Sequence, residues 1–271
     1  MNVVGIRFRE VGKIYYYKSE GLEYFYKDKV VVESDSGLVI GEVALENLEI
    51  DEEKFQKKIK PVLRLADACD LEKELTNTED ATKAIDTCQQ LADMHNLNMK
   101  VVDAEYTLDR NKLTFYFISD KRVDFRELVK DLAQSFKSRI ELRQIGVRDH
   151  AKLIKHYGSC GQQCCCSRHL TDFAPLSIKY AKDQNISLDP SKISGVCGRL
   201  MCCLSYEEDY YVEAKKTMPK YGQKVQTEDG EGMVISSDFV KSCCKVRLAH
   251  SQDEEKIEKI FKVDQINKID S

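Results

Sequence analysis

The sequence has no hydrophobic run long enough to cross a membrane. Its apolar stretches all fall short of the ~20 consecutive apolar residues that a membrane-spanning helix needs. The first residues, MNVVGIRFRE, also lack the basic region and the long apolar segment of a secretory signal. These absences argue against a membrane protein and against a secreted one, so we expect a soluble protein of the cytoplasm.

Recognisable catalytic motifs are absent as well. The sequence contains no P-loop, no dinucleotide-binding fingerprint and no H-E-x-x-H motif. Only five histidines occur in 271 residues, and their spacing to other residues does not suggest a nucleophile with a base and an orienting group. The sequence therefore nominates no catalytic residue.

Cysteine, by contrast, is abundant, with eleven residues. The reducing cytosol disfavours a disulfide framework, and an odd number of cysteines would leave at least one thiol unpaired. Metal ligation is the better explanation for the clustered cysteines, and burial in a core for the scattered ones. We expect Cys69 and Cys88 at helical core positions. Cys243 and Cys244 adjoin in a predicted strand, so one should be buried and the other exposed.

Composition and patterning predict a globular α+β protein, with 42% hydrophobic and 32% charged residues. Residues 1–60 are rich in β-branched and aromatic residues and predict a small, barrel-like, SH3-like β-rich block, with SDSG as a hairpin turn. Residues 207–271 predict a helix followed by a second barrel, SH3-like or KOW-like, because apolar and polar residues alternate between turn glycines.

Residues 61–149 predict a compact central domain with the order α-β-β-α-β. The first helix is predicted over 61–97, with Thr76 and Glu79 as a capping box. MKVVDAEYTL, KLTFYFIS and RIELRQIGV are the predicted strands. The apolar stripes at helical spacing are Ala81, Ile85, Cys88 and Ala92 in the first helix, and Phe125, Leu128, Leu132 and Phe136 in the second.

Residues 150–206 hold seven of the eleven cysteines and show little periodicity. The segment CGQQCCC, from Cys160 to Cys166, aligns with CGRLMCC, from Cys197 to Cys203, and both fit the pattern C-G-x-x-x-C-C. Glycine after the first cysteine allows a tight turn, and thiolates bind iron–sulfur centres and zinc. We expect an irregular segment that is organised around an inorganic centre.

The number of cysteines limits what such a centre can be. The two motifs share the six positions Cys160, Cys165, Cys166, Cys197, Cys202 and Cys203. One four-iron cluster or one zinc ion takes four ligands and two such centres take eight, so six matches neither number. Either some of the six are not ligands, or further ligands come from Cys164, His169 or a partner chain.

The distribution of charge supports an alternative, a zinc-stabilised nucleic-acid-binding module. The net charge is −4, but residues 61–120 hold 6 Lys and Arg against 12 Asp and Glu, and residues 121–155 hold 10 against 5. Such a reversal suggests a basic surface that could contact phosphates. The candidate RNA contacts on this surface are Lys121, Arg122, Arg126, Lys130, Arg139, Arg143 and Arg148.

A redox-active thiol enzyme is a more distant alternative.

Several of these segments resemble the bacterial RicT/YaaT family, whose members carry a PSP-type C-terminal domain. The resemblance rests on IELRQIGVRDHAKLI, on the two cysteine motifs and on IKYAKDQNISLDPSKISGVCGRLMCCLSYE. It covers most of the chain and is densest from about Phe115 to Glu207. The first cysteine motif departs from the family pattern, because Ser159 replaces a proline, Gln162 replaces an arginine and Cys164 is additional.

The resemblance implies a non-enzymatic regulatory subunit. Members of this family join two small helical partners, RicA and RicF, in a complex that contains iron–sulfur clusters. That complex acts with ribonuclease Y in messenger RNA processing and supports sporulation, competence and biofilm development. By this resemblance the ligands of a four-iron four-sulfur cluster fall on the six shared motif cysteines, with partner chains completing the ligand set and zinc as the alternative metal.

Overall fold

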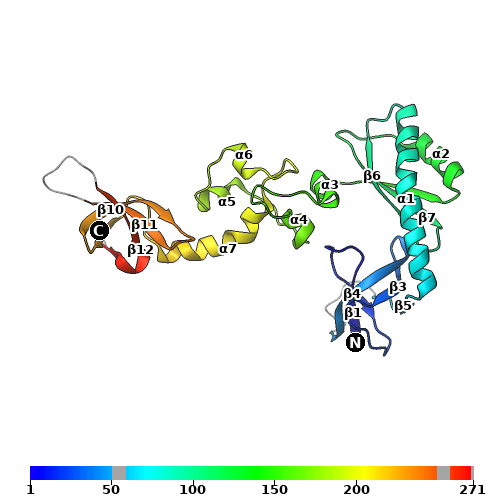
Figure 1. The fold of residues 1–271 in the computed structure, drawn as a ribbon, viewed down its shortest axis with the longest axis horizontal. Coiled ribbons are helices and arrows are strands. Elements are labelled where there is room, and N and C mark those ends of the chain that lie inside the picture. Colours follow the sequence, from blue (N-terminus) through cyan, green and yellow to red (C-terminus); the bar gives the residue numbers. More distant parts are fainter. Residues whose placement is uncertain (51–58, 249–256, 270–271) are drawn as a thin grey trace. The chain divides into compact units, whose positions relative to one another are not determined.

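The structure is a computed structural model that describes residues 1–50, 59–248 and 257–269 (Figure 1). The chain divides into two compact units, Met1–Asp172 and Phe173–Ser271. Together they contain three β-sheets and several helices, which confirms the predicted α+β class. None of the described helices combines the length and the apolar character that crossing a membrane requires.

The first unit begins with a five-stranded antiparallel sheet in the order β2-β1-β4-β3-β5. Its strands are β1 (Asn2–Arg7), β2 (Tyr15–Lys18), β3 (Lys29–Ser34), β4 (Gly37–Glu49) and β5 (Val62–Leu65). Ser34 pairs with Gly37, so SDSG forms the predicted hairpin turn. Since β5 belongs to this sheet, the sheet extends past the boundary predicted at residue 60. The SH3-like description of this block stays a prediction.

Helix α1 (Ala68–Met94) starts later than predicted, because β5 and the cap occupy the residues before it. The predicted capping box is wrong: Asp67 is the N-cap, and Asp67 and Asp70 each accept a hydrogen bond from the other's backbone N–H. Thr76 lies inside the helix and donates to the carbonyl oxygen of Glu72. The prediction that Cys69 is a core residue is wrong: Cys69 is exposed, whereas its neighbour Asp70 in the same turn is buried. Cys88 is fully buried as predicted.

The cap of α1 predicts a dependence of stability on acid. A hydrogen bond from Arg64 and one from the Asp67 backbone lower the pKa of Asp70 to about 2. A lowered pKa stabilises the folded state above the ordinary pKa of an aspartate, and this stabilisation is lost as the pH falls towards 2. We expect the melting temperature of Asp70→Asn to depend less on pH between about 4 and 2 than that of the parent. Arg64→Gln should flatten the dependence in the same way, and an unchanged slope in both variants would contradict this assignment.

The central sheet of the first unit has the order β6-β7-β8. Strands β6 (Lys100–Tyr106) and β7 (Lys112–Ile118) pair antiparallel, and β8 (Arg139–Gln144) runs parallel to β7 after the crossover helix α2 (Arg126–Phe136). Figure 1 shows α1 and α2 beside this sheet, and both helices contribute to its core. The predicted apolar stripes of both helices face that core, in which Phe115, Leu128 and Leu132 are fully buried.

The cysteine-rich part of the chain is more helical than predicted. Its helices are α3 (Val147–Ile154), α4 (Cys165–Arg168), α5 (Ile178–Asp183), α6 (Pro190–Ile193) and the start of α7 (Cys202–Thr217). Side-chain caps at Ser177 and Asp189 start two of these short helices, which is why a low hydrophobic periodicity did not exclude them. The prediction of an irregular segment over 150–206 is therefore only partly right.

The second unit ends in a five-stranded sheet in the order β12-β11-β10-β9-β13. The strands are β9 (Lys224–Thr227), β10 (Gly230–Asp238), β11 (Cys243–Leu248), β12 (Glu258–Lys262) and β13 (Asn267–Lys268), with a 3-10 turn, η2 (Val263–Gln265), before the last. In β11, Cys244 is fully buried, which confirms one half of the prediction for this pair, whereas Cys243 is half-buried rather than exposed. The SH3-like or KOW-like classification of this end stays a prediction.

Candidate metal centre

The first cysteine motif forms a tight hairpin that leads into a helix. Gly158 donates to the carbonyl oxygen of Gln162 at 2.8 Å, and Gly161 donates to the carbonyl oxygen of Gly158 at 3.0 Å. The N–H of Cys164 closes the hairpin by donating to the carbonyl oxygen of His156 at 2.8 Å, and α4 starts at the next residue. Cys160 therefore lies in the turn between Gly158 and Gly161.

The second motif repeats this hairpin bond for bond, 37 residues later in the chain. Gly195 donates to the carbonyl oxygen of Arg199 at 2.8 Å, and Gly198 donates to that of Gly195 at 2.9 Å. The N–H of Met201 closes the hairpin at 2.9 Å from the carbonyl oxygen of Ile193, and α7 starts at the next residue. The two motifs are thus equivalent in backbone structure as well as in sequence.

Glycines determine the shape of both hairpins. Gly161 and Gly198 have φ angles of +74° and +72°, a left-handed conformation that residues with a Cβ atom rarely adopt. Gly158 and Gly195 precede the turn cysteines, and a Cβ atom on them would lie 3.3 Å and 3.7 Å from the thiol sulfurs of Cys160 and Cys197. Sequence reasoning missed this second pair, although GSCGQQCCC and GVCGRLMCC align two residues further upstream.

The turn glycines give a graded prediction for the second hairpin. Gly198→Ala puts a side chain on a left-handed residue and should cost about 1 kcal/mol, which loosens the turn that holds Cys197. Gly198→Asn should cost less, because asparagine tolerates this conformation better than alanine does. We expect the affinity for zinc, measured with a competing chelator, to be highest in the parent, lower in Gly198→Asn and lowest in Gly198→Ala. Equal affinities for all three proteins would show that the turn does not position a ligand.

Each motif presents one thiol from its turn and two from the first turn of a helix. Cys160 is exposed and Cys197 half-buried, and the adjacent pairs Cys165–Cys166 and Cys202–Cys203 begin α4 and α7. Burial raises the pKa of the Cys203 thiol, and the nearby Glu207 and Cys202 raise it further. A metal ion would reverse this effect, because a coordinated thiol loses its proton.

Cys164 differs from the six shared cysteines in its place in the hairpin. It is the N-cap residue of α4, the position that Met201 occupies before α7. Met201 packs with the small apolar cluster around Ala181, Ile193 and Leu204, so in the second motif this position has a packing role. The structural comparison thus favours six equivalent thiols and sets Cys164 apart from them.

Neither hairpin completes a metal site by itself. Among the residues that the structure describes, no three His, Cys, Asp or Glu side chains are gathered closely enough to hold a metal ion. The donor set nevertheless fits a thiolate-bound centre in its chemistry, because each hairpin offers up to three sulfur ligands on a short, turn-stabilised segment. Further ligands would have to come from outside the hairpin.

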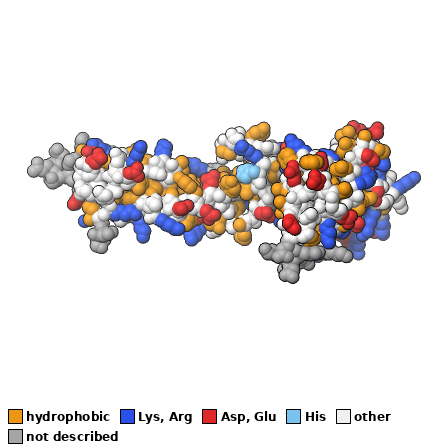
Figure 2. Space-filling model, turned by 90° about the horizontal axis from the view of Figure 1, so that it is seen from below, with side chains coloured by type: hydrophobic (Ala, Val, Ile, Leu, Met, Phe, Trp, Pro, Cys, Tyr) orange, Lys and Arg blue, Asp and Glu red, His pale blue; other side chains and the backbone are white. Residues whose placement is uncertain are grey.

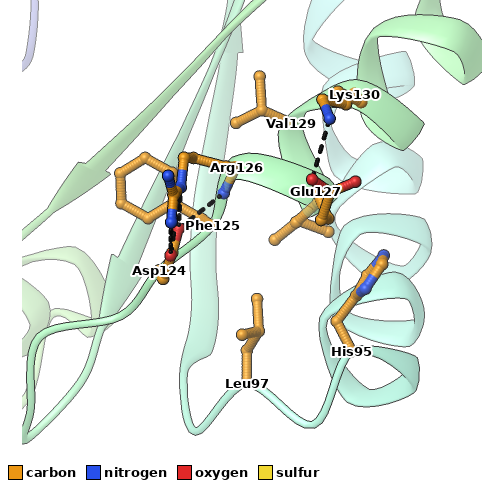
Figure 3. A pocket seen from close by; sticks show the side chains of 9 residues that line it. His95, Leu97, Asp124, Phe125, Arg126, Glu127, Val129 and Lys130 are labelled. Carbon is orange, nitrogen blue, oxygen red and sulfur yellow. Dashed lines mark hydrogen bonds and ion pairs between the residues drawn. The ribbon is translucent and has the colours of Figure 1, made fainter.

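The seven basic candidates for RNA binding are only partly brought together. They are distributed over the segment before α2, α2 itself, β8 and α3. Arg126 and Lys130 line one pocket of about 850 Å³. Each forms an ion pair there, Arg126 with Asp124 at 2.6 Å and Lys130 with Glu127 at 2.9 Å. Figure 3 shows both basic side chains turned towards these carboxylates. On the face drawn in Figure 2, Lys and Arg side chains lie among Asp and Glu side chains. These ion pairs weaken the case for a basic surface.

Comparison with known proteins identifies the family. The family model described as the PSP1 C-terminal conserved region matches residues 60–145, and the third domain of PSP1-like proteins matches residues 175–218. Stage 0 sporulation protein YaaT of Bacillus subtilis is 48% identical over 251 residues, which are 93% of this chain and 91% of that protein. The chain belongs to the YaaT family.

Two further relatives match much less of the chain. Protein PSP1 of Saccharomyces cerevisiae is 41% identical over 66 residues, which are 24% of this chain and 8% of PSP1. An uncharacterised protein of Schizosaccharomyces pombe is 42% identical over 81 residues, 30% of this chain and 11% of its own. No solved structure matches the chain. In this YaaT family member the second hairpin lies within the matched third domain, and the first lies between the two matched regions.

Proposed function

We propose that this YaaT family member is a non-enzymatic regulatory subunit that binds an iron–sulfur cluster together with other protein chains. The sporulation role named for the Bacillus relative, which matches over most of both chains, supports regulation of development as its purpose. Competence and biofilm formation belong to the same proposal. The complex would work in the cytoplasm with two small helical partners similar to RicA and RicF, and it would modulate messenger RNA processing by ribonuclease Y.

One observation carries this proposal: the two cysteine hairpins have the same backbone hydrogen bonds and present their thiols at the same three positions. Packing of the thiols does not explain this repeat, since Cys160 is exposed and four of the other five shared cysteines are only half-buried.

The cluster would be held by the turn cysteine and by one or both helix-start cysteines of a hairpin. The side chains of adjacent residues point in different directions, so Cys202 and Cys203 need not bind the same metal ion. When bound, the cluster would supply a redox-sensitive cross-link between chains, and the hairpins would hold the sulfur ligands in place. A ligand set that is incomplete within the described part of one chain is consistent with completion by a partner.

Metal and sulfide analysis of the protein purified anaerobically with its partners tests this function. We expect brown protein that contains iron and acid-labile sulfide, with the partner chains retained. Colourless protein with stoichiometric zinc and no sulfide would overturn the cluster and favour the zinc-stabilised RNA-binding module. In that case RNA affinity of the isolated chain should fall steeply as salt is raised, because phosphate contacts release counterions.

A further inference from the structure

Strand β8 leaves one edge of the central sheet open. Among the residues that the structure describes, β8 pairs with β7 alone and ends the sheet order β6-β7-β8. The N–H of Arg139 donates to Asn111 and the N–H of Ile145 donates to Phe117, both at 2.9 Å. The main-chain N–H and C=O groups of successive strand residues point alternately to the two sides of the strand. Those of the odd-numbered residues face β7, so those of Ile140, Leu142 and Gln144 face outwards.

The side chains of β8 divide cleanly between the two faces of the sheet. Ile140 and Leu142 pack against the core that α1 and α2 cover. Glu141 and Arg143 lie on the opposite face, and the carboxylate of Glu141 accepts a hydrogen bond from Nε of Arg143 at 2.5 Å. The sequence of the strand, Arg-Ile-Glu-Leu-Arg-Gln, therefore has an acid and a base on either side of Leu142.

We propose that β8 is a self-association edge, on which β8 of a second copy of this chain pairs antiparallel about a two-fold axis at Leu142. Outward-facing main-chain groups make Leu142 a hydrogen-bonded position, so Leu142 of each copy exchanges both main-chain hydrogen bonds with the other. Ile140 of each copy lies opposite Gln144 of the other and does the same. The result is one continuous sheet across the two copies.

Charge complementarity selects this occupant and this register. In the antiparallel pair Glu141 of each copy lies directly opposite Arg143 of the other, and opposite charges at facing positions stabilise a sheet. Because Glu141 also binds Arg143 of its own strand, each carboxylate then lies between two guanidinium groups. On the other face Leu142 meets Leu142 of the second copy and continues the core across the edge.

Charged residues on an edge strand can also serve to prevent pairing. A protective edge needs only charges of one sign or charges that face the incoming strand unfavourably. In β8 the acidic residue precedes Leu142 and the basic residue follows it. When a second copy runs antiparallel, each acidic side chain therefore faces a basic one. Self-association is thus the arrangement that these two side chains favour, and it is independent of any metal bound by the hairpins.

Sedimentation velocity of the full chain in reducing buffer, over a series of concentrations, tests the proposal. We expect a concentration-dependent monomer–dimer equilibrium for the parent. Glu141→Arg and Arg143→Glu should each weaken the dimer by roughly tenfold or more, because two facing attractions become repulsions. The swap Glu141→Arg/Arg143→Glu should restore it. A mixture of the two single variants should form a heterodimer, since every facing pair is then of opposite sign.

Two further variants separate pairing at the edge from changes within the monomer. Lys112→Gln removes the partner of Glu141 on the neighbouring strand and should leave the dimer intact. Gln144→Pro removes an outward N–H and no main-chain hydrogen bond to β7. It also removes the side-chain hydrogen bond from Gln144 to the carbonyl oxygen of Ser119, and it should give a folded monomer. A parent that stays monomeric at every concentration would overturn the proposal, as would single variants that dimerise like the parent.

Discussion

Serine in place of Cys197, or of whichever of Cys202 and Cys203 is a ligand, is expected to abolish metal binding by the second hairpin. Serine keeps the size of the side chain but is a poor ligand for iron and zinc, both of which favour thiolate in such sites. If each hairpin holds one centre, the iron content of the anaerobic complex should fall to about half that of the parent. The same changes at Cys160, or at whichever of Cys165 and Cys166 is a ligand, should remove the other half.

Cysteines outside the shared positions provide the controls for this experiment. Cys69 is exposed and Cys243 half-buried, and neither lies in a hairpin, so their serine variants should keep the full iron content. Cys164→Ser should also keep it, because Cys164 takes the place of Met201. Loss of iron in Cys164→Ser would make this residue a ligand and break the equivalence of the two hairpins. Undiminished iron in all six motif variants would place the cluster elsewhere in the complex.

The equivalence of the hairpins shows what the sequence made predictable. C-G-x-x-x-C-C occurs twice with the same spacing, and a repeated spacing leads to a repeated turn because glycine permits the same left-handed conformation at Gly161 and Gly198. The order α-β-β-α-β was predictable for a related reason, since the stripe from Phe125 to Phe136 has helical spacing and must face a core.

Other features depend on contacts that are distant in sequence or on short-range polar bonds. β5 joins the first sheet through pairing with β3, which no local pattern near Val62 reveals. The start of α1 is set by Asp67 and Asp70, whose carboxylates accept hydrogen bonds from the backbone and from Arg64. Thr76 and Glu79 have the spacing of a capping box but lie inside the helix, where there is no helix end to cap. The pairing of Arg126 with Asp124 likewise cancels charge that composition alone counts as basic.

The largest loss of stability is expected from Phe115→Ala. Phe115 is fully buried in the middle strand of the central sheet, where Ala104 of β6 and Leu142 of β8 lie beside it. Its ring is 5.9 Å from that of Phe136 on α2. Truncating a buried phenylalanine leaves a cavity and removes these contacts, which should lower the free energy of unfolding of the first unit by about 3–5 kcal/mol. That is a large part of the stability of a typical domain.

Urea unfolding followed by circular dichroism measures this loss, and Phe25→Ala is the matched control. Phe25 is 63% exposed, so the same change there should shift the midpoint little. Because the second unit has its own core around Val225 and Val246, its transition should be unchanged in Phe115→Ala. If both transitions shift together, the two units unfold as one. Phe115→Ala should also weaken the pairing of β8 with β8 of a second copy, because the cavity at Phe115 removes a side chain that lies beside Leu142.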